Sequence, residues 1–176
     1  HNAPTNNQVD VEFRVARGQA PSGCQCAASD MTKWFNTNYH YIVPELSAEL
    51  LRSELGVDVA PLLSQYNDAQ TISDNRKVIL IGPMTYLHLS VVENAEKLAL
   101  LPALLLRYQQ VLEQLSAAGV TWLQIDEPVL ALALNNDWQQ AFKQAYSNLN
   151  KGSLKLLLTT YFGAIDHQLG LIKDLP

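Results

Sequence analysis

The sequence is poor in cysteine, in basic runs and in long apolar runs. Cys24 and Cys26 are its only cysteines, and their spacing is poor geometry for a structural disulfide, so we expect a reducing, cytoplasmic location. The formal net charge of −5 gives no general attraction for nucleic acid. The longest strongly apolar region, 98–106, is interrupted by Pro102 and is much shorter than the roughly 20 residues that span a bilayer. We therefore expect neither nucleic acid nor a membrane as a partner.

The first residues, HNAPTNNQVD, have neither the charged region nor the apolar region of a secretory signal, and the chain does not begin with methionine. We interpret the chain as a fragment of a longer protein. Residues 1–30 are rich in Asn, Gly, Pro, Ser and Gln, which predicts a loop-rich lead-in. We expect residues 31–176 to form the folded part.

Short apolar runs predict four β-strands: YHYIV (39–43), KVILIG (77–82), TWLQI (121–125) and LKLLLTT (154–160). Most are almost continuously hydrophobic, which is typical of parallel strands covered on both faces. Amphipathic helical patterns lie between them, the clearest over 95–119, with Gly119 as its expected C-cap. Asn135 or Asn136 is expected to cap a second helix through about Asn148, and IGPMTYL predicts a turn in which Gly82 permits a close approach to its backbone and Pro83 sets the exit from the strand. This alternation predicts an α/β fold made of βα units. The absence of a GxGxxG motif or P-loop weighs against a nucleotide fold and favours part of a (β/α)8 TIM barrel, with about four parallel strands.

In parallel α/β folds the ligand-binding face is built from loops that follow the carboxyl ends of strands. Asp126 and Glu127 of IDEP occupy such a position. Two carboxylates could act in general acid–base catalysis, bind a cation or hold an amine. Because neighbouring side chains on an extended segment point to opposite sides, we expect at most one to face a ligand. The alternative is that they cap a helix or pair with a nearby cation.

The segment MTKWFNTNYHYIVPEL, residues 31–46, contains four aromatic side chains around a single lysine, Lys33. Such a lysine can offer its ammonium to a carboxylate or phosphate while the rings hold the loop rigid. The alternative is a lysine that extends into solvent. His40 and His88 are the only centrally placed histidines, and their spacing from the two cysteines matches no zinc module.

Taken together, these motifs resemble the N-terminal domain of the cobalamin-independent methionine synthase family. MTKWFNTNYHYIVPE is close to a signature of that family, and FRVARG, QAPSG, KVILIGPMTYL, GVTWLQIDEPVLAL and KLLLTTYFGAI occur in it in the same order. The resemblance implies an enzyme with two (β/α)8 barrels that transfers a methyl group from 5-methyltetrahydropteroyltriglutamate to homocysteine. Residues 31–176 would be part of the first barrel.

The resemblance also assigns roles. Lys33 matches a lysine that helps to bind the polyglutamate tail of the folate, and we expect Trp34 and Phe35 to shield its ammonium partly from water. The zinc that activates homocysteine belongs to the C-terminal barrel, so its ligands would lie outside this chain. We therefore expect no catalytic residue and no bound cofactor here, and no activity from the fragment alone.

Two other functions remain open at this stage. The chain could be a non-catalytic anion-binding or scaffolding half-barrel that associates with itself through its open sheet edges. A remoter alternative is a hydrolase that uses Asp126 and Glu127.

Overall fold

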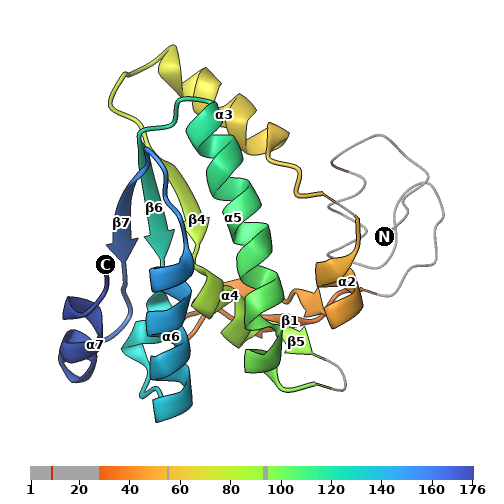
Figure 1. Cartoon of the computed structure of the whole chain (residues 1–176), viewed down its shortest axis with the longest axis vertical. Coiled ribbons are helices and arrows are strands. Elements are labelled where there is room, and N and C mark those ends of the chain that lie inside the picture. Colours follow the sequence, from red (N-terminus) through yellow and green to blue (C-terminus); the bar gives the residue numbers. More distant parts are fainter. Residues whose placement is uncertain (1–8, 10–27, 55, 93–94) are drawn as a thin grey trace. The chain divides into compact units, whose positions relative to one another are not determined.

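The computed structural model describes residues 9, 28–54, 56–92 and 95–176 (Figure 1). Both cysteines therefore lie outside the described residues, as does almost all of the predicted lead-in. The chain divides into two compact units, His1–Glu45 with Leu89–Val91 and Leu46–His88 with Val92–Pro176. The predicted boundary at residue 30 stays a prediction. Among the described residues, no helix has the length and apolar character needed to cross a bilayer.

The described part of the first unit contains a β-hairpin. Strands β1 (Met31–Lys33) and β2 (His40–Ile42) pair antiparallel, with Thr32 opposite Tyr41 and Lys33 opposite His40. The prediction that 39–43 is a strand of the parallel sheet is therefore wrong. A six-residue connection can only return the chain antiparallel, whereas parallel neighbours need a crossover of about a dozen residues or more. Strands β3 (Glu45–Leu46) and β5 (Val91–Val92) form a further small sheet where the two units meet in sequence.

The second unit is built on a three-stranded parallel sheet in the order β4–β6–β7. Its strands are β4 (Val78–Ile81), β6 (Trp122–Asp126) and β7 (Lys155–Thr159). They match three of the four predicted runs, so the described residues contain three parallel strands rather than about four. The prediction of an α/β fold with βα units is confirmed for this unit.

The helices of the second unit begin and end largely where the sequence predicts. Asn135 caps one helix by accepting from the Trp138 N–H at 3.0 Å, and Gly119 ends another with φ +78°. The segment after Gly82, predicted to be a turn, instead starts a helix at Pro83. The helices are α2 (Ala48–Arg52), α3 (Ala60–Gln70), α4 (Pro83–Leu89), α5 (Leu101–Ala117), α6 (Asn136–Asn148) and α7 (Leu169–Lys173), with 3-10 turns at Lys97–Leu100, Pro128–Ala131 and Asp166–Gln168.

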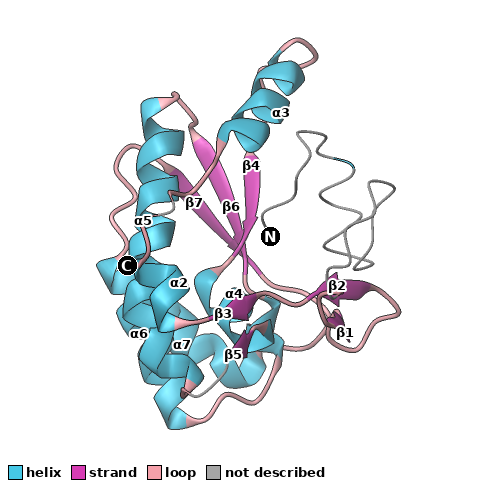
Figure 2. Ribbon diagram, turned by 90° about the vertical axis from the view of Figure 1, so that its right-hand side faces the viewer, coloured by secondary structure: helices cyan, strands magenta, loops and turns pink. Residues whose placement is uncertain are grey.

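Helices α5 and α6 cover one face of this sheet (Figures 1 and 2). Leu123 and Ile125 of β6 point to that face and are buried, as are Leu112 of α5 and Phe142 of α6. Side chains on the opposite face alternate with them and stay exposed: Ile79 at 51%, Trp122 at 44% and Leu157 at 42%. The sheet therefore has one packed face and one open face, on which large apolar side chains lie among polar ones such as Gln124 and Lys155.

Candidate functional site

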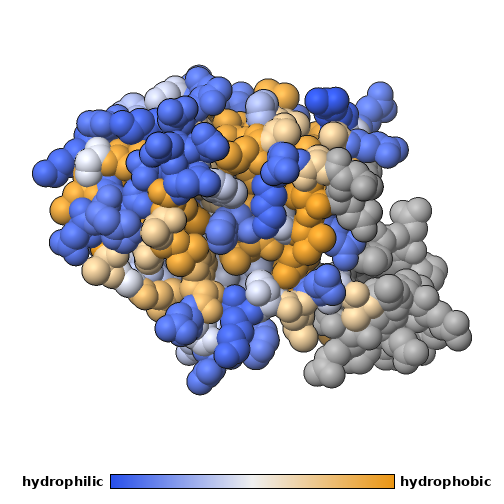
Figure 3. Space-filling view, turned by 90° about the horizontal axis from the view of Figure 1, so that it is seen from below, coloured by the Kyte–Doolittle hydropathy of each residue, from blue (hydrophilic) through white to orange (hydrophobic). Residues whose placement is uncertain are grey.

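The carboxyl ends of the three parallel strands lie in register. Ile81, Asp126 and Thr159 are neighbours across the sheet, so their side chains share one face. The ladder extends one residue further, because the Gly82 N–H donates to the Asp126 carbonyl and the Glu127 N–H donates to the Thr159 carbonyl, both at 2.8 Å. Figure 3 shows the end toward which these strands point, where hydrophobic side chains lie among hydrophilic ones. These hydrogen bonds hold the backbone of the acidic pair, Asp126 and Glu127, in place.

Glu127 is fully buried. Its Oε1 accepts from the Met84 N–H at 3.1 Å and from the Tyr146 hydroxyl at 2.7 Å, and its Oε2 accepts from the Thr85 N–H at 2.7 Å. Met84 and Thr85 are in the first turn of α4, whose free N–H groups need acceptors. The side chain of Glu127 therefore caps α4 and joins it to β6 and α6.

Burial raises the pKa of Glu127 to about 7, because a carboxylate loses solvation in the protein interior. The hydrogen bonds from Thr85, Tyr146 and Met84 act in the opposite direction. Burial also raises the pKa of the Tyr146 phenol, and the Glu127 charge adds to that rise. Glu127 and Tyr146 thus form a buried pair with a shared hydrogen bond.

Gly82 allows this arrangement. A Cβ atom at Gly82 would lie 2.2 Å from the Glu127 Cδ, far inside van der Waals contact. Only glycine leaves room for the carboxyl group to reach the start of α4. The prediction that Gly82 permits a close approach to its backbone is confirmed, and the approaching group is a side chain of this same chain.

Asp126 has a different environment, although it is the neighbour of Glu127. It is partly exposed. Its Oδ1 accepts from the Gln124 Nε2 at 2.7 Å and its Oδ2 accepts from the Tyr161 hydroxyl at 3.1 Å. These contacts hold the carboxylate in one orientation and leave lone pairs for a further donor. Such a group can bind an amine or an amide N–H.

The loop after β7 supplies the tyrosine of this network. Phe162, its neighbour, adopts φ +70°, a left-handed conformation that costs free energy for a residue with a side chain. The rings of Tyr161 and Phe162 pack edge to face at 4.6 Å between centroids, and Phe162 is 51% exposed. Backbone strain of this kind persists where surrounding contacts enforce it, often at functional sites.

Lys33 lies at the end of β1 and is exposed. The aromatic rings near it pack on one another: Trp34 meets Phe35 at 5.4 Å and Tyr41 at 5.1 Å between centroids. These ring contacts stabilise the loop, and the expectation that Trp34 and Phe35 partly shield the ammonium stays a prediction. The Trp34 N–H donates to the Tyr39 carbonyl at 2.7 Å, and Phe35 takes φ +51°. Lys33 thus extends from a constrained hairpin loop.

Metal ligands do not gather in the described residues. No group of three or more His, Cys, Asp or Glu side chains there could hold a metal ion. His40 is exposed on β2, and His88 packs its ring against Trp138 at 5.3 Å. The described residues therefore do not fit a zinc ion.

Sequence reasoning overlooked Gln124 and Tyr146. Gln124 could have been found, because a polar residue two positions before Asp126 on a strand shares its face. Tyr146 carries no such signal, since it lies on α6 and reaches Glu127 only through the fold.

Comparisons with known proteins agree with one another. The family model described as the N-terminal domain of cobalamin-independent synthase matches residues 1–176. Similar relatives include the 5-methyltetrahydropteroyltriglutamate–homocysteine methyltransferases of Photobacterium profundum, 51% identical over 169 residues, and Proteus mirabilis, 51% identical over 170 residues. The enzyme of the same name from Shewanella oneidensis is 44% identical over 170 residues. These alignments cover 95%, 96% and 96% of this chain and 22% of each relative.

Proposed function

Because the chain belongs to the cobalamin-independent synthase family and matches the N-terminal domain of that family, we propose that it is part of a methyltransferase that converts homocysteine to methionine. The methyl donor is 5-methyltetrahydropteroyltriglutamate, as the names of the relatives state for those enzymes. In this proposal the chain helps to bind the folate, and it is inactive without the rest of the enzyme. The observation that carries the proposal is the identity of about half of all aligned residues along almost the whole chain.

Residues 31–176 form part of a (β/α)8 barrel in this proposal. Three parallel strands with helices over one face are its support. The open face, with Ile79, Trp122 and Leu157 exposed, is the face that a closed barrel fills with side chains. The remaining strands would belong to the longer protein.

Lys33 binds the glutamate tail of the folate. The tail carries several carboxylates, and an exposed ammonium can pair with them. The constrained loop supports this role, because a hairpin held by Trp34 and Tyr41 limits the positions that the base of the lysine can take. The aromatic residues contribute rigidity, while the charge remains in solvent until the ligand arrives.

Asp126 is the residue at the carboxyl-end rim of the sheet that contacts the ligand. Glu127 has a positioning role. Asp126 has an oriented, partly exposed carboxylate that can accept a hydrogen bond from an N–H of a substrate. The fully buried Glu127 holds the β4–α4 turn beside it. No proton transfer is assigned to either residue.

Zinc supplies thiolate activation in the full-length enzyme of this proposal. In this proposal its ligands lie in the C-terminal barrel, as the family resemblance implies. Homocysteine binding would belong to that barrel as well.

The test is an assay of the longer protein that contains this chain. Purified with zinc and a reductant, it should form methionine from homocysteine and 5-methyltetrahydropteroyltriglutamate without a corrin. The 176-residue chain alone should form none under the same conditions. Absence of methionine in the full-length assay would refute the proposal.

A second candidate is a non-catalytic scaffold that associates with itself. The open face of the sheet favours it, because exposed hydrophobic surface of this kind promotes association. Sedimentation equilibrium of the isolated chain distinguishes the two functions when it is combined with the assay. A stable dimer of the chain together with an inactive longer protein would favour the scaffold.

A further inference from the structure

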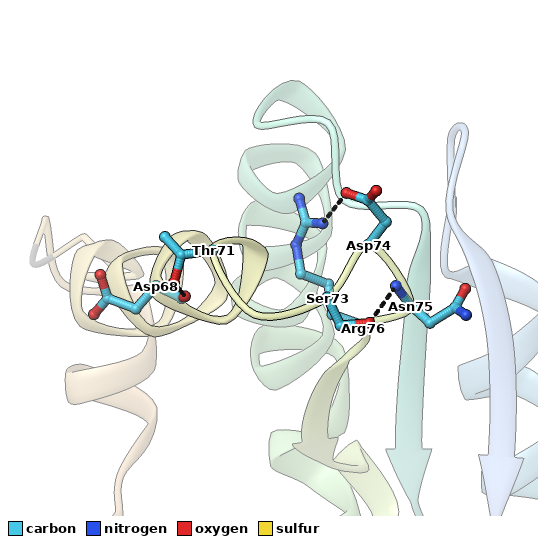
Figure 4. Close-up of polar contacts among 6 residues, drawn as sticks. All are labelled: Asp68, Thr71, Ser73, Asp74, Asn75 and Arg76. Atoms are coloured by element: carbon cyan, nitrogen blue, oxygen red, sulfur yellow. Dashed lines mark hydrogen bonds and ion pairs between the residues drawn. The ribbon is translucent and has the colours of Figure 1, made fainter.

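Figure 4 shows the turn that joins α3 to β4 at the amino end of the parallel sheet. The acidic pair lies at the other end of the sheet, where β6 finishes at Asp126. Its backbone is held locally. The Thr71 hydroxyl donates to the Asp68 carbonyl at 2.7 Å, and the Asn75 N–H donates to the Ser73 hydroxyl oxygen at 3.1 Å. Arg76 follows this turn, two residues before β4 begins at Val78.

Arg76 is largely buried for an arginine, with 15% of its side chain exposed. Its guanidinium lies over the Tyr66 ring at 4.4 Å from the centroid, which fixes the plane of the charged group. Its ion-pair partner, Asp74, is 3.8 Å away, beyond hydrogen-bond distance, and the Asp74 side chain is 99% exposed. Arg76 Nε is buried and has no acceptor among the described residues. The guanidinium is therefore oriented but poorly satisfied.

A hollow of about 590 Å³ opens beside this guanidinium. It is lined by residues from α3, from the turn and from the segment that leads into β6: Tyr66, Asp74, Asn75, Arg76, Lys77, Gly119, Thr121 and Trp122. Lys155, the register partner of Trp122, holds its Nζ 5.4 Å from the centroid of the Trp122 ring. Two cations, Arg76 and Lys77, and one exposed carboxylate, Asp74, therefore line the hollow.

We propose that this hollow binds a small ligand that carries a phosphate group. The charges of Arg76 and Lys77, less that of the exposed Asp74, leave a net positive lining, and a phosphate monoester carries about −1.5 to −2 at pH 7. The planar guanidinium can pair with two phosphate oxygens at once.

This site is separate from the proposed folate role. Four residue steps along β6 separate Trp122 from Asp126, which is about 13 Å at the usual rise of a strand. Ligands of parallel sheets usually bind at the carboxyl end, where Asp126 lies. A phosphate site at the amino end would therefore be a second function of the same sheet, located at the amino rim of the proposed barrel, where Trp122 begins β6.

Titration of the full chain with inorganic phosphate tests the proposal. We expect saturable binding with a Kd of about 1 mM at low ionic strength, and weakening by added NaCl, because the contact is between charges. The probes observed are the tryptophan indole N–H signals in an NMR spectrum, with the Trp122 signal assigned from Trp122→Phe. The Trp122 signal should shift most.

Two further probes identify the source of the phosphate. Adenosine 5′-monophosphate that binds at least tenfold more tightly than inorganic phosphate points to a nucleotide whose base stacks on Trp122. Equal affinities point to the phosphate group alone. Adenosine that binds without any binding of phosphate would overturn the proposal.

Substitutions connect the binding to these residues. Arg76→Gln should weaken phosphate binding at least tenfold, and Arg76→Lys should weaken it less, since the charge remains but the planar fork is lost. Asp74→Asn should tighten binding by about threefold, because it removes the one competing carboxylate. Lys173→Gln, which removes an exposed charge on α7, is the matched control and should change binding less than about twofold.

Asp74 keeps the proposal testable if Arg76→Gln fails to fold. Its side chain is 99% exposed, so replacing it leaves the packing intact. Two results would overturn the proposal. One is the absence of any shift of the Trp122 signal at a phosphate concentration 10-fold above the expected Kd. The other is an equal affinity for phosphate of the unmodified chain and Asp74→Asn.

Discussion

The Tyr146 hydroxyl lies 2.7 Å from Oε1 of Glu127, and both side chains are buried. One residue comes from the last turn of α6 and the other directly follows β6. Because the same carboxyl group also accepts from two N–H groups of α4, it links three elements that are distant in sequence. A buried carboxyl group with this number of donors has consequences for stability that can be measured.

Replacing Glu127 with Gln should destabilise the chain by about 1–3 kcal/mol. The amide keeps one acceptor but places an NH2 group against donors, so at least one buried N–H or O–H loses its partner. Urea unfolding followed by circular dichroism measures the change. Glu113→Gln on the exposed side of α5 is the matched control and should stay within about 0.5 kcal/mol. Equal stability of both variants would show that the Glu127 contacts contribute little.

The stability of the chain should fall as the pH rises from 4.5 to 7. The pKa of Glu127 is raised from 4.5 to about 7, so the folded state holds a proton in this window that the unfolded state has released. The stabilisation is fully present below pH 4.5 and is lost as the pH rises through 7. A shift of this size corresponds to about 3 kcal/mol.

The pH effect of Glu127 has to be separated from that of His88. Burial, and then the charge of Lys97, lower the pKa of His88, so its contribution changes in the opposite sense, with stability lost as the pH falls through the same region. Comparing the unmodified chain with Glu127→Gln at pH 5, 6, 7 and 8 cancels the His88 contribution. The unmodified chain should show the steeper decline. Parallel profiles would mean that Glu127 titrates alike in both states.

Gly82→Ala should destabilise the chain by about 3 kcal/mol or more, because the new Cβ would displace the buried Glu127 carboxyl group from its donors. Gly170→Ala on α7 is the control, since nothing lies within 4 Å of its added Cβ, and it should be neutral or slightly stabilising. The double variant with Glu127→Ala provides a sharper measurement. It should be scarcely less stable than Glu127→Ala alone, whereas additive losses would place the clash elsewhere.

Most of the second unit follows from local sequence signals. Apolar runs identify β4, β6 and β7. Asn135 and Gly119 mark helix ends, because asparagine favours an N-cap and glycine adopts the positive φ that ends a helix. The IDEP pattern correctly places an acidic pair at the carboxyl end of a strand. These signals are strong because each depends on residues that are close together in the chain.

The errors arise where partners are distant or ambiguous. The run 39–43 has the apolar character of a parallel strand, but its pairing with Met31–Lys33 depends on the short connection between them. The sequence predicts a turn in place of helix α4, because Pro83 is compatible with a turn and with the first turn of a helix. The N-terminal cap of α4 comes from Glu127, more than forty residues later. The different environments of Asp126 and Glu127 could be anticipated from strand alternation, but the burial of Glu127 beside Tyr146 could not.

Lys33→Ala in the longer protein should raise the KM for 5-methyltetrahydropteroyltriglutamate about tenfold, because one charge-assisted contact to the tail contributes about 1.5 kcal/mol or more. The kcat should change little, since the tail is remote from the transferred methyl group. The form with a single glutamate, which has fewer carboxylates for Lys33 to bind, should show a smaller change. Lys33→Arg should retain most of the affinity, and Lys173→Gln controls for the loss of one exposed charge. Equal KM values for Lys33→Ala and the unmodified enzyme would remove Lys33 from the binding site, and an equal rise for both folate forms would show that it contacts a part of the folate other than the additional glutamates.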